Sequence, residues 1–212
     1  MTIRRATLTG LAVAALSFVA AAALYDRLPE SMPVHWNIHG IADGFMPKPW
    51  GVFFYPAFIG FFALLAAVLP AISPRGFRIE PFMRAFDVIV TALIVFFACL
   101  MIAIFAGALG FPIPVDRLLL AGIGILLATI GNVMGKTTPN FFVGIRTPWT
   151  LANSEVWLRT HRLGGRLFVV AGLALLGAAA LGLDPFIPFL GLIGVPLVLT
   201  AYSYVLYRKL EK

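Results

Sequence analysis

Long apolar runs separated by short polar segments dominate the chain. The six runs are residues 6–25, 50–72, 86–110, 118–134, 163–183 and 186–207. Each is long enough, or nearly so, to cross a hydrocarbon core of ~30 Å at a rise of ~1.5 Å per residue. Lipid contains no water to hydrogen-bond with exposed backbone groups, so membrane spans are helices or closed β-barrels. The segments of alternating apolar and polar residues that form a transmembrane β-barrel are absent from this sequence. The pattern therefore predicts an all-α integral membrane protein, a bundle of six transmembrane helices.

The first run also has some features of a cleaved signal peptide. Arg4 and Arg5 precede it, and its end is rich in alanine. However, its apolar stretch is long for a signal core, and Leu24-Tyr25-Asp26 is a poor cleavage site. We expect a retained membrane helix here.

The composition agrees with a lipid environment. Hydrophobic residues make up 61% of the 212 residues and charged residues only 12%, whereas soluble domains average about 45–50% and about 25%. A soluble chain of this length has too much surface to bury such an excess. The single cysteine, Cys99, excludes an intrachain disulfide.

The positive charges are distributed unevenly between the two sides of the predicted bundle. All but three of the 16 lysine and arginine residues fall in the two termini, in the segments that join runs two to three and four to five, or, in the case of Arg166, at the start of the fifth run. The exceptions are Arg27, Lys48 and Arg117. Because cytoplasmic segments carry the excess of such residues, both termini are predicted to be cytoplasmic in the plasma membrane. The net charge of +7 then reflects topology and attraction to the lipid bilayer, not direct contact with nucleic acid.

The stretch 131–150, GNVMGKTTPNFFVGIRTPWT, contains a GKT that resembles a phosphate loop. A Walker A loop needs four residues between its glycines and a strand before it. Here only three residues separate Gly131 from Gly135, and the preceding segment is a membrane helix. We therefore expect this stretch not to be a Walker A phosphate loop.

The same stretch favours a folded loop over a slack linker. Gly135 is expected to end the fourth helix, and Gly144 to supply a turn that a side chain would block. Pro139 and Pro148 restrict the residues before them to extended conformations. The amide of Asn132, in the last turn of an apolar helix, needs a partner.

Residues 150–165 are predicted to form a short interfacial helix that leads into the fifth membrane helix. Thr150 or Ser154 is expected to cap its start. Trp157, His161 and Gly164 share one face, which we expect to turn toward the bundle. Glu155 and Arg159 are spaced as an i,i+4 ion pair. For Trp157, the alternative is an anchor at the membrane interface. For His161 it is a structural hydrogen-bonding role, and for Arg146 it is contact with a lipid phosphate.

Residues 28–50, in the segment predicted to face outward, contain His35, His39 and Asp43 at a spacing of four. On a helix these residues could share a metal-binding face. Pro33, Gly40 and Gly44 disfavour a helix in this segment. Two histidines and one aspartate without a fourth ligand are also only weak evidence for a metal site. We expect a folded outer loop held by Asn37 and Asp43, without a metal, and a surface for an external ligand is the alternative.

The centres of the predicted helices contain no firmly buried charge. Asp87 lies near the end of the third helix. Because charged groups inside membranes usually mark ion or proton paths, their absence argues against a proton-coupled transporter.

Two stretches resemble known families. The stretch GN-xx-GK-xx-PN-xxx-GIRTPWTL-xxxx-VW-xx-THR-xx-G, residues 131–165, resembles the signature of SdpI-type bacterial immunity proteins. The outer stretch LP-xxx-P-x-HWN-xx-G-xx-DG, residues 28–44, is similar to a short module of unknown function that often precedes that signature. Together with the six-helix plan, the two resemblances cover most of the chain. They suggest two regions: residues 1–73, with the outer module at 28–50, and residues 74–212, with the cytoplasmic loop at 135–162.

The resemblance implies a non-catalytic immunity or receptor protein without metal or cofactor. The founding members of the family protect a cell against a secreted toxic peptide that collapses the membrane potential, and they hold a cytoplasmic repressor at the membrane. A small transporter or channel, or a membrane-embedded metal-dependent enzyme, is the alternative. The resemblance places binding residues at His35, Asn37, Gly40, Asp43, Asn132, Lys136, Pro139, Asn140, Gly144, Arg146, Thr147, Pro148, Trp149, Trp157, Thr160, His161 and Arg162.

Overall fold

A computed structural model of the chain describes residues 5–37, 41–184 and 186–211. Six long helices in this part of the chain are long and apolar enough to cross a membrane. They are α1 (Arg5–Leu24), α2 (Trp50–Ile72), α3 (Met83–Ala108), α4 (Val115–Met134), α6 (Ser154–Leu181) and α7 (Phe186–Leu210). The predicted six-helix membrane bundle is confirmed.

The shorter elements lie between these helices. They are the 3-10 turns η1 (Tyr25–Arg27) and η2 (Glu80–Phe82), the strands β1 (Ser31–Trp36) and β2 (Ala42–Pro47), and the helix α5 (Pro148–Ala152). The two strands pair antiparallel, with Ser31 opposite Pro47 and Pro33 opposite Phe45. This hairpin was not predicted. Residues such as Pro33 and Gly44 disfavour a helix, and strand pairing satisfies the backbone groups that a helix would otherwise satisfy.

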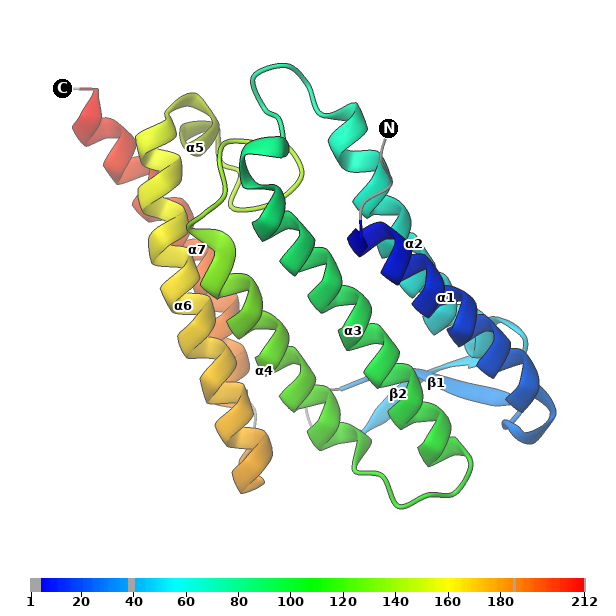
Figure 1. The fold of residues 1–212 in the computed structure, drawn as a ribbon. Coiled ribbons are helices and arrows are strands. Elements are labelled where there is room, and N and C mark those ends of the chain that lie inside the picture. Colours follow the sequence, from blue (N-terminus) through cyan, green and yellow to red (C-terminus); the bar gives the residue numbers. More distant parts are fainter. Residues whose placement is uncertain (1–4, 38–40, 185, 212) are drawn as a thin grey trace.

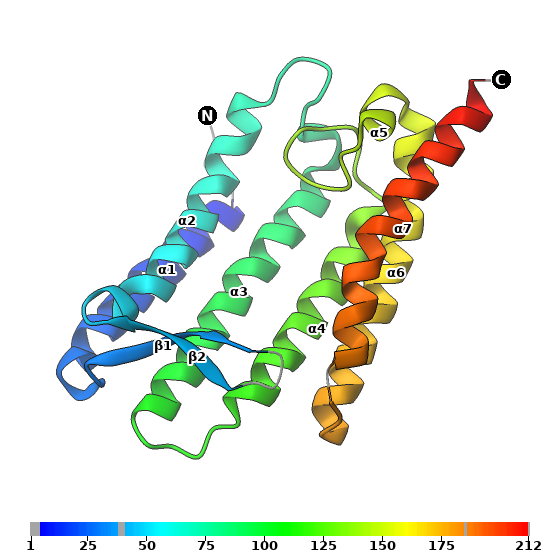
Figure 2. The ribbon, with the colours of Figure 1, turned by 180° about the vertical axis from the view of Figure 1, so that it is seen from behind.

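The helices run alternately up and down, so the two chain termini lie at the same end of the bundle (Figures 1 and 2). That end also holds the α2–α3 connection and α5, and we call it the basic end because all but three of the lysine and arginine residues that the structure describes belong to it. The opposite end, called the hairpin end, holds β1, β2 and the α3–α4 connection. The positive-inside rule predicts that the basic end faces the cytoplasm.

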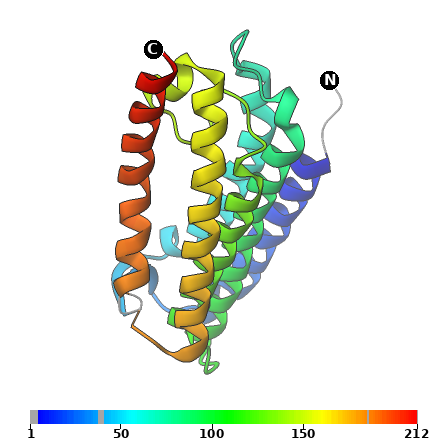
Figure 3. The same cartoon turned by 90° about the vertical axis from the view of Figure 1, so that its left-hand side faces the viewer.

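The bundle consists of two groups of helices. The first group is α1, α2 and α3, the second is α4, α6 and α7, and they meet where α3 packs on α4. Figure 3 shows α6 and α7 together at one side of the molecule, with α1 and α2 at the far side. In the first group, buried Ile59, Ala63 and Phe86 belong to an apolar cluster between α2 and α3. A second cluster includes Met32 of the hairpin and Tyr55 of α2. The Tyr55 hydroxyl donates to the Pro33 carbonyl at 3.1 Å, which ties the hairpin to the first group.

Glycines let α4 and α6 pack almost backbone to backbone. A Cβ built on Gly131 would lie 2.6 Å from the Gly165 carbonyl oxygen, and one on Gly124 would lie 2.7 Å from that of Gly172. The two contacts repeat at seven-residue spacing on both helices. Close approach of this kind is typical of helix pairs in membranes, where packing drives association. It fixes the end of α4 beside the start of α6, which positions the loop between them.

The start of α6 differs from the prediction. The expected short interfacial helix and the fifth membrane helix are one continuous helix, Ser154–Leu181. Gly164 and Gly165, which favoured a break, are instead buried packing positions: Gly165 faces Gly131 of α4. Residues near the basic end of α6 are therefore held as rigidly as its membrane-spanning part.

Candidate functional site

Residues 135–153, called here the basic-end loop, join α4 to α6. Gly135 is the C-cap of α4, as predicted, and a Cβ there would lie 3.2 Å from Cγ of Arg162, so the arginine stem packs over the helix end. Asn132 is exposed. Its amide therefore faces the surroundings of the bundle, and the expectation that it needs a partner stays a prediction. The loop therefore starts at a tightly covered helix end.

Asn140 organises the first half of the basic-end loop. Its side chain is fully buried. The Nδ2 amide donates to the carbonyls of Thr138 and Val143 at 2.8 and 3.0 Å. The Oδ1 atom accepts from the backbone N–H groups of Phe142 and Val143 at 2.9 and 2.7 Å. One side chain thus satisfies four backbone groups and fixes the turn that they form.

Trp157 and His161 of α6 form hydrogen bonds with the backbone of the loop from the interior of the bundle. Both are buried, as their predicted face requires, and their rings stack at 3.9 Å. The Trp157 indole donates to the Thr137 carbonyl at 3.0 Å. His161 Nε2 accepts from the Ile145 N–H at 2.9 Å, so its Nδ1 carries the proton that is donated to the Trp157 carbonyl at 2.8 Å. The alternative that Trp157 is an exposed interface anchor is wrong.

Gly144 provides the turn that brings the loop onto His161. Its φ of +114° lies in a region that side chains rarely adopt, and a Cβ there would lie 2.3 Å from His161 Nε2. The predicted need for glycine is confirmed. The close approach is what allows the next residue, Ile145, to donate its N–H to the imidazole.

The second half of the loop is held by hydroxyl groups. Thr147 caps α5 in a capping box with Thr150. Thr147 Oγ1 also lies 3.0 Å from Oγ of Ser203 on α7. Asn153 caps α6 by accepting from two backbone N–H groups. The single cap predicted at Thr150 or Ser154 was wrong: α6 is capped by Asn153, the residue before Ser154, and Thr147 caps the separate helix α5, each from an extended backbone conformation.

Sequence reasoning missed Thr137, Asn153 and Ser203. The cap signal could have revealed Asn153, because asparagine before an acidic first turn is a frequent helix start. Ser203 gives no local signal, since its partner Thr147 is 56 residues away.

The predicted binding residues of this region fall into two sets. Buried ones hold the fold, as the contacts above show. Thr160 is also fully buried, and its hydroxyl has no hydrogen-bond partner among the residues that the structure describes. The exposed ones are Asn132, Lys136, Arg146, Pro148 and Arg162. Pro139 and Trp149 are half-buried, and the ring of Trp149 lies 5.0 Å from that of Tyr204.

Arg146 is exposed, yet it is anchored. Its guanidinium donates to the carbonyl of Phe141, across the loop. The predicted Glu155–Arg159 pair also forms, at 2.6 Å, on the exposed face of α6. Together with Lys136 and Arg162, these arginines give the basic end a cationic surface on a rigid base.

The outer segment presents its polar groups to the surroundings. His35 Nδ1 lies 2.6 Å from Asp43 Oδ1, and the two side chains are 71% and 44% exposed. Asn37 Oδ1 accepts from the Ile41 N–H at 3.1 Å. The prediction that Asn37 and Asp43 hold this segment is confirmed by these contacts.

Two predicted residues of the outer segment, His39 and Gly40, lie outside the residues that the structure describes. Within the described part of the chain, no three histidine, cysteine, aspartate or glutamate residues gather as a metal site would require.

A cleft of about 490 Å³ lies at the hairpin end, between the hairpin and the second group of helices. Trp36 and Asn37 form one wall, and Asp116, Arg117 and Asp184 lie on the other. The three charged residues come from the start of α4 and from the α6–α7 connection. No pattern in the sequence predicts that these distant residues lie beside the hairpin.

Two family models and one curated protein match the sequence of this chain. The sequence model of the SdpI/YfhL protein family matches residues 136–207, which begin within the basic-end loop. The model of a "Domain of unknown function (DUF1648)" matches residues 12–60, which include the hairpin. The Immunity protein SdpI of Bacillus subtilis (strain 168) is 28% identical over 202 residues, which cover 94% of each chain. No solved structure matches the chain.

Proposed function

Because the chain belongs to the SdpI/YfhL protein family, we propose that it is a non-catalytic membrane immunity protein that protects against a secreted, membrane-active peptide. The observation that carries this proposal is the end-to-end match to Immunity protein SdpI, which spans 94% of both chains. A match of that extent includes the outer hairpin, all six helices and the basic-end loop.

The hairpin end is where we place contact with the peptide. Five carboxylates belong to this end, at residues 26, 30, 43, 116 and 184, against three cations at 27, 48 and 117. The resulting negative potential attracts a cationic peptide. The cleft between Trp36 and Asp184 adds an aromatic wall beside carboxylates, which suits a peptide with both basic and apolar side chains.

The basic-end loop is where we place contact with a cytoplasmic repressor. A surface that recognises one partner benefits when its charged groups are held in fixed positions. The network around Asn140 and His161 provides that rigidity, and Arg146 is held against the loop backbone. The exposed cations would then meet an acidic surface on the partner.

Helices α4 and α6 connect the two proposed contact regions. The hairpin-end cleft lies at the start of α4 and the end of α6, and the basic-end loop lies at their opposite ends. Backbone contact at Gly124 and Gly131 couples the two helices along their length. A peptide bound at one end could therefore shift the loop by moving the helix pair as one body.

Protection of the membrane potential tests the function. Sensitive bacteria would carry an empty vector, the wild-type protein, Arg146→Ala or Arg159→Ala, and a voltage-sensitive dye would report the potential during challenge with the peptide toxin of the SdpI family. We expect the wild type and Arg159→Ala to retain the potential and Arg146→Ala to lose it, because the Arg146 guanidinium holds the basic-end loop together by donating to the Phe141 carbonyl. Arg159 is the matched control because it is an exposed cation that pairs with Glu155 on the same surface.

Collapse of the potential in all four strains, with the proteins shown to be in the membrane, would contradict the immunity function. Protection by Arg146→Ala would show that immunity does not depend on the Arg146 contact within the loop, and the immunity function itself would stand.

A further inference from the structure

The hairpin formed by β1 and β2 lies beside the membrane-spanning helices and not beyond their ends. In Figures 1 and 2 it crosses α3 and α4, while the α3–α4 connection extends farther out. Met32 of β1 belongs to the same buried cluster as Met101 and Phe105 of α3, and Trp36 lines the same cleft as Ile123 of α4. Met101 lies seven residues before the end of α3, and Ile123 lies eight residues after the start of α4. The hairpin therefore reaches roughly 10–12 Å inside the helix ends at a rise of ~1.5 Å per residue.

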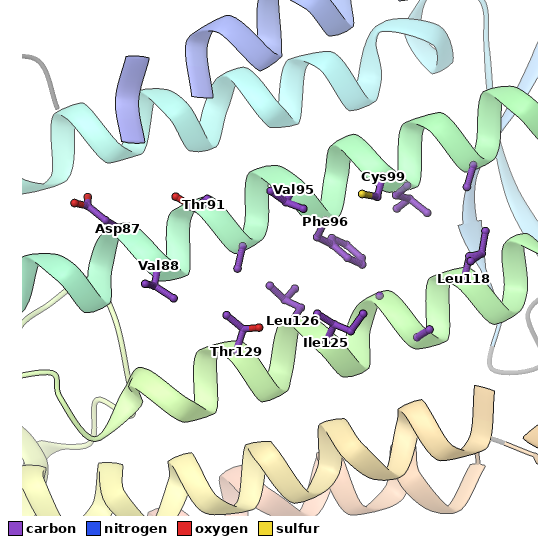
Figure 4. A pocket seen from close by; sticks show the side chains of 15 residues that line it. Asp87, Val88, Thr91, Val95, Phe96, Cys99, Leu118, Ile125, Leu126 and Thr129 are labelled. Atoms are coloured by element: carbon purple, nitrogen blue, oxygen red, sulfur yellow. The ribbon is translucent and has the colours of Figure 1, made fainter. Parts of the chain in front are cut away.

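Another face of the same two helices is apolar and exposed at this level. A groove of about 630 Å³ runs between α3 and α4, and its part toward the hairpin end is lined by apolar side chains and Cys99 (Figure 4). Leu118 and Ile125 line the groove, whereas Ile123 lines the cleft beside the hairpin. Ile102 of α3 and Leu118 of α4 are 63% and 48% exposed. Exposed apolar side chains on membrane-spanning helices face lipid, so lipid reaches the level of the hairpin.

The outward face of the hairpin combines apolar and polar side chains. Exposure alternates along β2, so that Asp43, Phe45 and Pro47 are exposed and the residues between them are half-buried. Phe45 is 57% exposed, and Asp43 on the same face pairs with His35. Trp50, which starts α2 soon after the hairpin, is 73% exposed. Aromatic side chains near polar groups are typical of the head-group layer of a membrane, which accommodates both.

The backbone of the hairpin also favours the head-group layer. A two-stranded hairpin has unpaired N–H and C=O groups along its outer edges, and hydrocarbon offers these groups no partners. Bulk water would satisfy them, but it would also surround the rings of Phe45 and Trp50. The head-group layer contains water and accepts aromatic rings, and it extends roughly 5–8 Å beyond each side of the ~30 Å hydrocarbon core.

We propose that the hairpin is an interfacial element whose outward face contacts the lipid head groups of the leaflet at the hairpin end. Phe45 and Trp50 are its anchors in that layer. This placement does not depend on the proposed immunity function. If that function holds, a membrane-active peptide meets the hairpin-end cleft at the level of the head groups, because Trp36 of the hairpin forms one wall of the cleft.

Depth-dependent fluorescence quenching of the full-length protein tests the placement. A bimane label would be attached to Phe45→Cys or to Ile41→Cys in a Cys99→Ala background, and the protein would be reconstituted in phosphatidylcholine vesicles. Nitroxides on the lipid head group or deep in the acyl chain quench from the lipid, and iodide quenches from water. We expect the head-group nitroxide to quench both labels several-fold more than the acyl-chain nitroxide or iodide does. Both positions are exposed, so the label displaces no packed side chain.

Two control positions calibrate the measurement. Val95→Cys, which is 52% exposed in the middle of α3, should be quenched most by the acyl-chain nitroxide. Glu211→Cys, which is exposed just after α7, should be quenched most by iodide. Phosphatidylcholine with a photoreactive group in its head should also label residues 41–50 of the wild-type protein, which makes the test independent of the variants.

Three results would overturn the proposal. The first is quenching of the hairpin labels by iodide to the extent seen for Glu211→Cys, which would place the hairpin in water. The second is a preference for the acyl-chain nitroxide like that of Val95→Cys, which would place the hairpin in hydrocarbon. The third is weak quenching by all three agents and no labelling of residues 41–50, which would mean that another protein surface, such as a second copy of the chain, covers this face.

Discussion

The basic-end loop together with the start of α6, and the outer hairpin with its connection, are similar in composition, since both combine histidine, asparagine, glycine and proline between apolar runs. In the structure they differ in burial. His161 and Asn140 are fully buried and bonded to backbone groups of the loop. His35 and Asp43 bond to each other and are 71% and 44% exposed. Similar residues therefore form a small polar core at one end of the bundle and an accessible surface at the other.

The difference shows how to separate stability from recognition in this chain. Changes in the buried network should unfold the loop, and changes in the hairpin should leave the fold unchanged. The following variants test that comparison by unfolding in detergent, in order of decreasing expected effect.

Gly144→Ala should be the most damaging change. The new Cβ would meet His161 Nε2, and the φ of +114° is strained for alanine. We expect a loss of about 3–5 kcal/mol in the free energy of unfolding. Gly177→Ala is the matched control, because a Cβ at that helical position meets nothing within 4 Å. Similar unfolding temperatures for the two variants would show that the loop is not held against His161.

Asn140→Ala should have the next largest effect. It leaves two carbonyls and two N–H groups of the loop without their partner, and we expect a loss of about 2–4 kcal/mol. The readouts are thermal unfolding and the rate of proteolysis within residues 135–153. Asn132→Ala, on an exposed position of α4, should leave both values unchanged. Equal sensitivity of the two variants would contradict the assignment of Asn140 to a polar core.

Trp157→Phe tests a single bond of the network. Phenylalanine keeps a ring that stacks on His161 and removes the indole N–H that donates to Thr137. We expect a loss of about 1 kcal/mol in the free energy of unfolding. Trp149→Phe, whose ring lies beside Tyr204 at the half-buried surface, should cost less. A larger loss at Trp149 would place the centre of the network nearer α7.

His35→Ala and Asp43→Asn should have the smallest effect. Exposed ion pairs contribute about 0–1 kcal/mol, so we expect both unfolding temperatures to stay close to that of the wild type. A loss as large as that of Asn140→Ala would mean that the hairpin is also a stability element. Intact stability with lost toxin protection would sharpen the comparison by assigning recognition to the hairpin.

The fold was largely predictable and the site only in part. Five of the six helices could be placed within a few residues from apolar run length alone. The continuity of α6 could not, because Gly164 and Gly165 indicate a break unless their packing partners are known. Trp157, His161 and Gly144 could be assigned correctly to the bundle interior from helical spacing and turn chemistry. The predicted helix cap was wrong, because the residue at which a helix starts depends on the backbone conformation just before it. The division of the chain at residues 73 and 74 stays a prediction.

By itself the sequence determined the environment, the number of spans and the predicted sidedness of this protein. Those properties depend on run length and on charge near the helix ends, which are local and additive. Only the tertiary structure decided that α4 and α6 touch at their glycines, that Thr147 meets Ser203, and that a groove lies between α3 and α4. Such contacts join residues far apart in the chain, and they depend on the relative positions of whole helices, which no short stretch of sequence encodes.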